Sequence, residues 1–200
     1  MAVFTSKQIV VPSLGPTFVD YLETTGAQYI AVGFTSNNNT RIVIDVETIG
    51  SPAVAIPFGG WQSQVSDGHF AMFQASQFMA FYGGAARYNS QSFVDKRVTI
   101  DANKNSWKLT VNGKTTTISY SAASFTCGQS MYLMAANSSG RASNYFTGRI
   151  YSCQIYDNGT LVRDFWPCYD PDGVACLLDK VESEYYYNQG SGEFIAGVAA

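Results

Sequence analysis

The sequence predicts an all-β fold, built as a sandwich of short antiparallel strands. Aromatic residues make up 14% of the 200 residues, and Ser, Thr and Asn are abundant, a composition typical of sheets. Apolar and polar residues alternate along several segments, and Asn-Gly and Asp-Gly pairs separate them. No window of about 12 residues carries a capped helical stripe.

Size and composition indicate one domain. A chain of 21.8 kDa buries about 70% of the surface that its unfolded form exposes. Hydrophobic residues are 46% and charged residues 14%, against roughly 25% charged in an average soluble domain. This balance excludes a disordered chain, a coiled coil and a nucleic-acid-binding tail.

The segment from Arg41 to Glu47 is the clearest strand. Because strand side chains alternate, one face receives Ile42, Ile44 and Val46. The other face receives Val43, Asp45 and Glu47. Residues 98–102 and 107–111 alternate in the same way.

Dipeptide turns order the remaining strands. Asn112-Gly113 predicts a two-residue hairpin turn before a strand from Lys114 to Tyr120. Asn158-Gly159 repeats this turn between 150–156 and 160–165, and Asp67-Gly68 and Asp172-Gly173 indicate two more. We expect roughly 12–14 short strands, at the spacing of a sandwich.

Alternation along 148–156 predicts two mixed faces. Four residues are assigned to one face, namely Ile150, Ser152, Gln154 and Tyr156. The other face receives Arg149, Tyr151, Cys153 and Ile155. Mixed faces are expected where another layer or a loop covers a sheet.

The charge is unevenly distributed. The net charge is −3, which does not support a basic, phosphate-binding surface. The stretch from Asp157 to Glu193 holds eight acidic and two basic residues. This stretch is interpreted as a solvated acidic face, and a cation or partner site is the alternative.

No cofactor and no metal are expected. The four cysteines, Cys127, Cys153, Cys168 and Cys176, form no C-x-x-C pair, and His69 is the only histidine, so a structural zinc site is discounted. Cys153 is predicted to be a small buried hydrophobe. Cys168 and Cys176 could pair in an oxidising setting, a question that the sequence leaves open.

The N-terminal segment is a possible attachment arm. Residues Pro12 to Pro16 hold two prolines, which separate an arm over 1–17 from a domain over 18–200. A first edge strand with a loop is the alternative. The arm lacks a basic start followed by an apolar core of about seven residues, so no Sec-type signal is expected. No run approaches about 18 apolar residues, so no membrane insertion is expected.

Three stretches carry a family resemblance. They are 20–30 (DYLETTGAQYI) followed by Gly33-Phe-Thr and Asn39-Thr-Arg41, then 98–105 through Val111-Asn-Gly113, and finally 145–165 followed by Pro167 and 190–194 (GSGEF). Together they resemble the laminin-G-like, or concanavalin-A-like, domains common in tailed phages, prophages and gut bacteria. The resemblance covers residues 18–197 and implies a two-sheet antiparallel jelly-roll sandwich. One departure is Ala31-Val32, where similar domains often carry Asp-Thr.

An enzyme is not expected. Glucanases that share this fold carry an E-x-D-x-E strand, in which two glutamates flank the scissile bond. Here Asp45 and Glu47 occupy two positions, but Val43 stands where the nucleophile would be. His69 follows a tight turn without a Gly-x-Ser-x-Gly elbow, so a serine triad is not supported. Asp170-Pro-Asp172-Gly is interpreted as a turn, because it is too short for a calcium loop.

Glycan binding is the predicted activity. Sugar sites combine aromatic faces with side chains that bind hydroxyls, and three segments interleave the two kinds of residue. Trp166 and Tyr185–Tyr187 are assigned mainly to packing. The candidate glycan-binding residues are Trp61, Gln62, Tyr82, Arg87, Tyr88, Asn89, Asn137 and Arg141.

The resemblance implies a non-catalytic virion protein of a phage, a capsid decoration or tail accessory protein capable of adhesion to cell-surface glycans. It would be made in the host cytoplasm, released by lysis, and joined through residues 1–17 to other virion proteins or sister subunits. A homo-oligomer would cover its edge strands. The alternatives are a carbohydrate-binding module of a bacterial surface protein and a purely structural capsid cement protein.

Overall fold

The computed structural model describes residues 15–51, 53–63, 66–119, 121 and 124–199. Nineteen strands and no helix occur in these residues, and the strands form two sheets. The predicted all-β, two-sheet jelly-roll sandwich is therefore confirmed. The predicted arm lies outside the described residues up to position 14, and Thr17 is already part of a sheet, because it pairs with Tyr169.

The larger sheet has eleven strands. Its main path runs β11-β10-β9-β4-β15-β16-β17-β18, and three short strands pair at its side. The strands are β1 (Thr17–Phe18), β2 (Leu22–Thr25), β4 (Thr40–Thr48), β9 (Arg97–Asn103), β10 (Ser106–Val111), β11 (Lys114–Ser119), β15 (Thr147–Asp157), β16 (Thr160–Tyr169), β17 (Ala175–Asp179), β18 (Glu184–Tyr186) and β19 (Ile195–Ala196).

The smaller sheet has eight strands, in the order β14-β13-β5-β6-β7-β8, and β12 pairs with both β5 and β3. Its pairings are antiparallel except for β13 with β5. The strands are β3 (Ile30–Ala31), β5 (Ala55–Trp61), β6 (His69–Phe73), β7 (Phe78–Tyr82), β8 (Ala85–Asn89), β12 (Tyr132–Leu133), β13 (Ala136–Ser138) and β14 (Arg141–Ser143).

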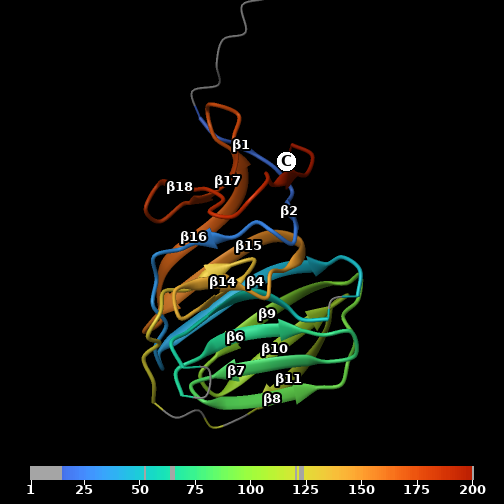
Figure 1. Ribbon diagram of the computed structural model, residues 1–200, viewed down its shortest axis with the longest axis vertical. Coiled ribbons are helices and arrows are strands. Elements are labelled where there is room, and N and C mark those ends of the chain that lie inside the picture. The colour runs from blue at the N-terminus through green and yellow to red at the C-terminus, as the bar shows by residue number, and fades with distance from the viewer. Residues whose placement is uncertain (1–14, 52, 64–65, 120, 122–123, 200) are drawn as a thin grey trace, which may run out of the picture.

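The two sheets lie face to face, and the C-terminal hairpin extends beyond them (Figure 1). The reason is that two different strands pair, one after the other, with the same edge of β15. Its first residues, Thr147–Ile150, pair with β2, and its last, Cys153–Asp157, pair with β16. The second half of β16 therefore extends beyond the sandwich, where it pairs with β17 and β1.

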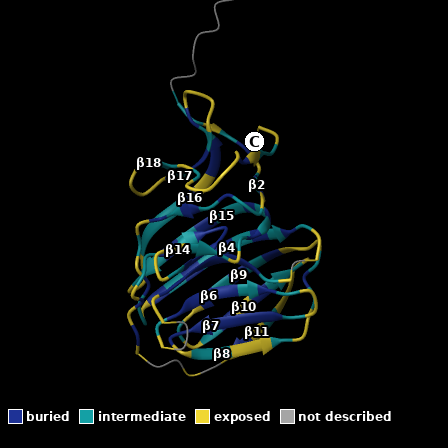
Figure 2. Ribbon diagram, viewed as in Figure 1, coloured by how far each residue is buried: buried dark blue, intermediate teal, exposed yellow. Residues whose placement is uncertain are grey.

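The core fills the space between the sheets. The predicted alternation in β4 is confirmed, because Ile42, Ile44 and Val46 are fully buried. From the larger sheet, Trp107 packs between Phe58 and Phe78 of the smaller one, with ring centroids 5.9 Å and 6.2 Å away. Buried aromatic rings of this size dominate core energetics. Figure 2 shows the buried strands between exposed turns and an exposed outer strand, β8.

The predicted faces of β15 are wrong beyond its midpoint. The pairing with β4 shifts between Ile150 and Ser152, so Tyr151 is an extra residue in the ladder, a β-bulge. Ile150, Cys153 and Ile155 are consequently all buried in the core. Tyr151 and Gln154 are only partly buried and lie on the outer side. Cys153 is the buried small residue that was predicted.

A second apolar cluster lies on the other face of the smaller sheet. Strands β6 and β7 contribute alternate residues to it, so these strands are apolar on both faces. Phe70 and Phe81 stack with centroids 4.7 Å apart. Trp61 packs on Phe70 at 4.9 Å.

The predicted turns at Asn112-Gly113, Asn158-Gly159 and Asp172-Gly173 are confirmed, and Asp67 lies in a turn that ends before Gly68. Asn112 and Asn158 adopt positive φ before their glycines, as two-residue hairpins require. Asp170 Oδ1 accepts hydrogen bonds from the N–H groups of Asp172 and Val174, which closes the turn there.

All four cysteines are free and buried. No group of three or more His, Cys, Asp or Glu side chains is placed to hold a metal ion within the described ranges. The same ranges hold no helix long and apolar enough to cross a membrane.

Candidate functional site

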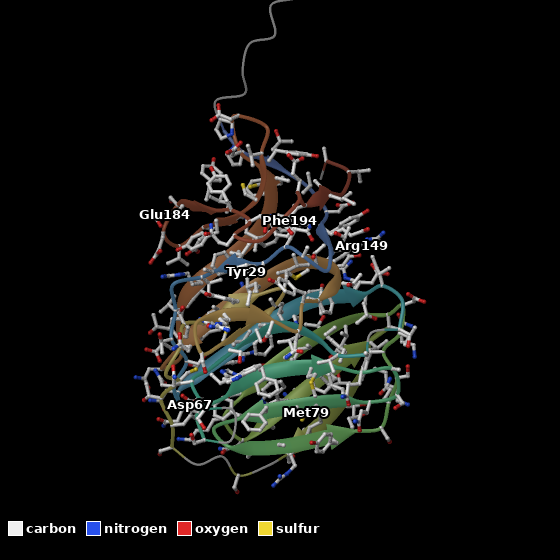
Figure 3. All side chains as sticks on the ribbon, in the orientation of Figure 1. Tyr29, Asp67, Met79, Arg149, Glu184 and Phe194 are labelled. Atoms are coloured by element: carbon white, nitrogen blue, oxygen red, sulfur yellow. The ribbon has the colours of Figure 1, made fainter. Side chains whose placement is uncertain are left out.

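A shallow cleft of about 540 Å³ opens where the N-terminal and C-terminal parts of the chain meet. It lies between the β2–β3 turn, the start of β14 and a loop near the C-terminus. Figure 3 shows Tyr29 beneath Phe194, where the C-terminal segment meets the sandwich. The cleft is lined by Gly26, Ala27, Tyr29, Arg141, Ala142, Tyr145, Gln189, Gly190 and Ser191.

One wall is a loop held to the β2–β3 turn by backbone hydrogen bonds. The N–H of Gln189 donates to the carbonyl of Tyr29 at 2.8 Å, and that of Ser191 donates to the carbonyl of Ala27 at 3.1 Å. Asn188 Oδ1 accepts from the N–H of Tyr29 at 3.1 Å. These bonds place the side chains of Gln189 and Ser191 beside Tyr29.

Gln28 stiffens the turn from the inside. Its buried side-chain oxygen accepts from the Thr24 hydroxyl at 2.8 Å and from the N–H of Thr25 at 3.0 Å. Its amide nitrogen donates to the carbonyl of Glu193 at 3.1 Å. One side chain therefore ties β2 to the C-terminal loop, so the cleft is preorganised.

Tyrosine rings form the aromatic part of the cleft. Tyr29 packs against Tyr132 with centroids 4.7 Å apart and against the edge of Tyr145 at 6.2 Å. Burial raises the pKa of Tyr29, and the neighbouring Tyr132 and Tyr145 raise it further. Its hydroxyl is therefore protonated at neutral pH and can donate a hydrogen bond. None of the three hydroxyls has a hydrogen-bond partner in the described part of the chain.

Arg141 is positioned by a tight hairpin. Strands β13 and β14 pair Ser138 with Arg141, and the turn between them uses positive φ at Ser139 and Gly140. Asn137 Oδ1 accepts from the N–H of Gly140 at 2.8 Å, and its Nδ2 donates to the carbonyl of Ser130 at 2.9 Å. Asn137 thus fixes the hairpin that carries Arg141.

Arg141 differs from the other five arginines. Four are ion-paired with carboxylates, and Arg87 donates to the carbonyl of Ala86. Arg141 has neither kind of partner among the residues that the structure describes. Its five N–H donors are therefore available to a ligand.

Two other hollows are less suited to a ligand. In the first, of about 410 Å³, the Tyr187 hydroxyl already donates to Asp170 at 2.8 Å. In the second, of about 380 Å³, Lys180 Nζ lies 3.8 Å from the Trp166 ring centroid and the Arg97 guanidinium 3.6 Å from that of Tyr151. These rings already hold cations, so their faces are partly occupied.

Trp166 and Tyr187, which the sequence assigns mainly to packing, leave 39% and 40% of their surface exposed. Each also contacts other side chains, Trp166 with Lys180 and Tyr187 with Asp170. Both lie on the C-terminal part that extends from the sandwich, where fewer neighbours cover them.

The sequence-based candidates do not form one site. Arg141 lines the cleft, and Asn137 lies beneath it with 2% of its surface exposed. Gln62 is exposed on the neighbouring loop, and its carbonyl accepts a hydrogen bond from the Ser139 hydroxyl at 2.8 Å. Asn137 was predicted to contact the glycan, but its side chain is occupied inside the protein.

Trp61 and Tyr82 were predicted to be exposed, and both are buried, with 6% and 0% exposed. Trp61 belongs to the second apolar cluster. Tyr82 lies in the main core, where its hydroxyl donates to the carbonyls of Asn37 and Thr40 at 3.2 Å each. Neither ring is available for stacking against a sugar.

Arg87, Tyr88 and Asn89 lie on β8, at the opposite edge of the smaller sheet from β14. Tyr88 is 61% exposed. Three strands of the main path, β5, β6 and β7, separate them from the Arg141 hairpin. These three residues therefore cannot bind the same small ligand as Arg141.

Sequence reasoning missed Tyr29, Tyr145, Gln189 and Ser191. A signal for Tyr29 was present, because it lies in the first stretch that carries the family resemblance. The third stretch holds Tyr145 and, in its final part over 190–194, Ser191, whereas Gln189 lies just outside it. What the sequence lacked was the contact between these stretches.

The carboxylates considered for hydrolysis lie elsewhere. Asp45 and Glu47 are on the outer face of β4, where Arg97 contacts Asp45 at 2.8 Å and Arg149 contacts Glu47 at 3.1 Å. The Tyr151 hydroxyl also donates to Glu47 at 2.6 Å. Among the described residues no carboxylate lines the cleft.

Solved structures similar to this one include carbohydrate-binding and laminin domains. A protein from Bacteroides ovatus described as carbohydrate-binding has a TM-score of 0.58 at 10% identity, over 91% of this chain and 61% of its own. Domains LG4-5 of the mouse laminin alpha1 chain give 0.51 at 16%, over 100% and 52%. The CBM40 of the Ruminococcus gnavus IT-sialidase gives 0.50 at 15%, over 68% and 89%.

These likenesses define the class of the fold, a laminin-G-like jelly roll. No family model matches the sequence, and no curated protein matches it either.

Proposed function

We propose that this chain is a non-catalytic carbohydrate-binding module, which binds an oligosaccharide in the cleft between Tyr29, Tyr145 and Arg141. The observation that carries the proposal is that the hydroxyls of Tyr29 and Tyr145 and the guanidinium of Arg141, which have no partner among the described residues, meet in one preorganised cleft. A protein of similar fold supports a sugar ligand, because the CBM40 of the Ruminococcus gnavus IT-sialidase was solved with bound α2,6-sialyllactose.

The cleft offers both contacts that a sugar needs. A pyranose ring presents C–H groups that pack on an aromatic face, and its hydroxyls need donors and acceptors. Tyr29 and Tyr145 supply rings, and Gln189 and Ser191 supply polar groups. The shallow shape suits recognition of a chain on a larger glycan.

The cleft does not offer the groups that most glycoside hydrolases use. Those enzymes place a pair of carboxyl groups about 5–10 Å apart across the scissile bond. The described residues of the lining hold no carboxylate, and Asp45 and Glu47 are held in ion pairs on another face.

The direct test is a glycan array on the full chain, followed by calorimetry with the best oligosaccharide. Tyr29→Ala and Tyr145→Ala should each weaken binding by roughly 5- to 160-fold, the factor that corresponds to an aromatic contact of about 1–3 kcal/mol. Tyr88→Ala is the matched control, because it removes an exposed tyrosine from the opposite sheet edge.

The possible outcomes separate the candidate sites. Loss of binding in Tyr88→Ala with full binding in Tyr145→Ala would move the site to β8. An array on which no oligosaccharide binds would overturn the proposed function. Circular dichroism of each variant confirms that the sandwich is intact.

Location is a separate question. Display on a virion through residues 1–17 stays a prediction, and so does display on a bacterial surface. Proteomics of purified particles, compared with a cell-surface fraction, distinguishes the two.

A further inference from the structure

We infer that the sugar bound in the cleft carries a carboxylate, and that Arg141 pairs with it through two parallel hydrogen bonds. This inference rests on the proposed function and adds the chemical class of the ligand.

The first argument is the state of Arg141 itself. The chain pairs four of its arginines with its own carboxylates and leaves Arg141 exposed, without an acceptor among the described residues. A guanidinium presents a planar fork of donors that matches a carboxylate bidentately. An arginine kept free at the mouth of an aromatic cleft is suited to such a ligand.

The second argument is the charge of the lining. Arg141 is the only charged residue among the nine that line the cleft. This is notable because the C-terminal stretch that forms one wall belongs to the most acidic region of the sequence. The nearest acidic residue of that loop, Glu193, lines the neighbouring hollow.

The third argument is the positioning of the guanidinium. Asn137 is buried, and both the nitrogen and the oxygen of its side-chain amide form hydrogen bonds that hold the β13–β14 hairpin. A buried amide that holds a surface hairpin in one conformation reduces the cost of ordering Arg141 on binding. The adjacent hydroxyls of Tyr29 and Tyr145 can then bind the hydroxyls of the same sugar.

Carboxylated sugars come from two sources, uronic acids and sialic acids, and the experiment uses both. Calorimetry of the full chain compares a glucuronic-acid-terminated oligosaccharide with its glucose-terminated counterpart, and sialyllactose with lactose. At low ionic strength at least one acidic member should bind roughly 10- to 100-fold more tightly than its neutral partner, as expected for a charge-assisted pair.

Arg141→Gln should abolish that preference, so that the acidic and the neutral member of each pair bind with equal affinity, whatever the change in the affinity for the neutral sugar. Arg141→Lys should restore only part of it, because lysine cannot pair bidentately. Arg87→Gln is the matched control, since it removes the same charge from the opposite edge of the sheet. It should retain the full preference.

Three outcomes would overturn the inference. If neutral and acidic partners bind equally, the cleft binds sugars without regard to charge, and only the proposed function survives. If Arg141→Gln keeps the preference, or Arg87→Gln loses it equally, the carboxylate is not read by Arg141. If no sugar binds, the inference and the proposed function both fail.

Discussion

The backbone of Gly190 passes so close to Ala27 that a Cβ on Gly190 would lie 2.0 Å from the Ala27 carbonyl oxygen. Real Cβ atoms do not approach backbone oxygen this closely, so the two segments can touch only because residue 190 is glycine. The contact joins the C-terminal loop to the β2–β3 turn, and these two segments form one wall of the cleft.

Gly190→Ala should therefore push the loop away from the turn. We expect a loss of roughly 1–3 kcal/mol in the free energy of unfolding, as for an overpacked site, together with weaker sugar binding. Urea denaturation and calorimetry measure the two effects. Gly15→Ala is the control, because a Cβ there meets nothing within 4 Å. Equal stability and binding of the two variants would show that the loop does not depend on this contact.

Asn137→Ala tests the hairpin that carries Arg141. Removing a buried amide leaves the Ser130 carbonyl and the Gly140 N–H without their partners. The cost should be about 1–3 kcal/mol, with a drop in affinity for the acidic sugar. Asn89→Ala, on the exposed strand β8, removes one hydrogen bond at the other sheet edge. It should change neither quantity strongly, and a similar loss in both variants would argue against a special role for Asn137.

Much of the fold could be predicted because one face of several strands meets a single core. In β4 the run of Ile42, Ile44 and Val46 at alternate positions, opposite a face that carries Asp45 and Glu47, identifies the buried face directly. The rule fails in β15, because one extra residue at Tyr151 moves every later side chain to the other face. Nothing in the local sequence marks that bulge.

The site was harder to predict because the exposure of an aromatic side chain depends on whether both faces of its sheet are covered, which the local sequence does not show. Trp61 and Tyr82 stand beside glycines, as loop aromatics often do, but the smaller sheet is apolar on both faces and buries them. The cleft combines Tyr29 near one end of the chain with Gln189 near the other. The pairing of β2 with β15 and β19 and the hydrogen bonds between residues 27–29 and the C-terminal loop bring these segments together.

The structure places Cys168 and Cys176 where they could form the disulfide that the sequence left open. The two residues face each other across β16 and β17, and their sulfur atoms lie 3.7 Å apart as free thiols. Incubation with glutathione disulfide should convert this pair to a disulfide by thiol exchange, releasing two molecules of reduced glutathione and lowering the protein mass by about 2 Da. The short closed loop should raise stability by about 2–3 kcal/mol.

Mass spectrometry with peptide mapping checks this pairing. Cys168→Ser is the control, because the same treatment should not produce the loss of about 2 Da in that variant. Cys127 and Cys153 have no such partner across a strand in the described pairings and should stay reduced. A glutathione adduct that persists on Cys168 or Cys176, without closure of the disulfide, would contradict the expectation.

The last prediction concerns His69, which is fully buried among the aromatic rings of Phe58, Tyr82 and Trp107. Neither ring nitrogen has a hydrogen-bond partner in the described structure. Burial lowers the pKa of His69 from 6.5 to about 3. The folded state thus keeps the ring neutral, while the unfolded state takes up a proton below its ordinary pKa.

Stability should therefore be complete above pH 6.5 and fall as the pH drops toward 3. Within that range, this one group should lower the free energy of unfolding by up to about 1.4 kcal/mol for each pH unit of acidification. His69→Leu removes the titrating group and the two unpaired nitrogens, so it should be as stable as the original protein near pH 7 and increasingly more stable at pH 5 and 4. Urea denaturation at each pH measures the difference, and parallel pH profiles of the two proteins would refute a neutral buried histidine.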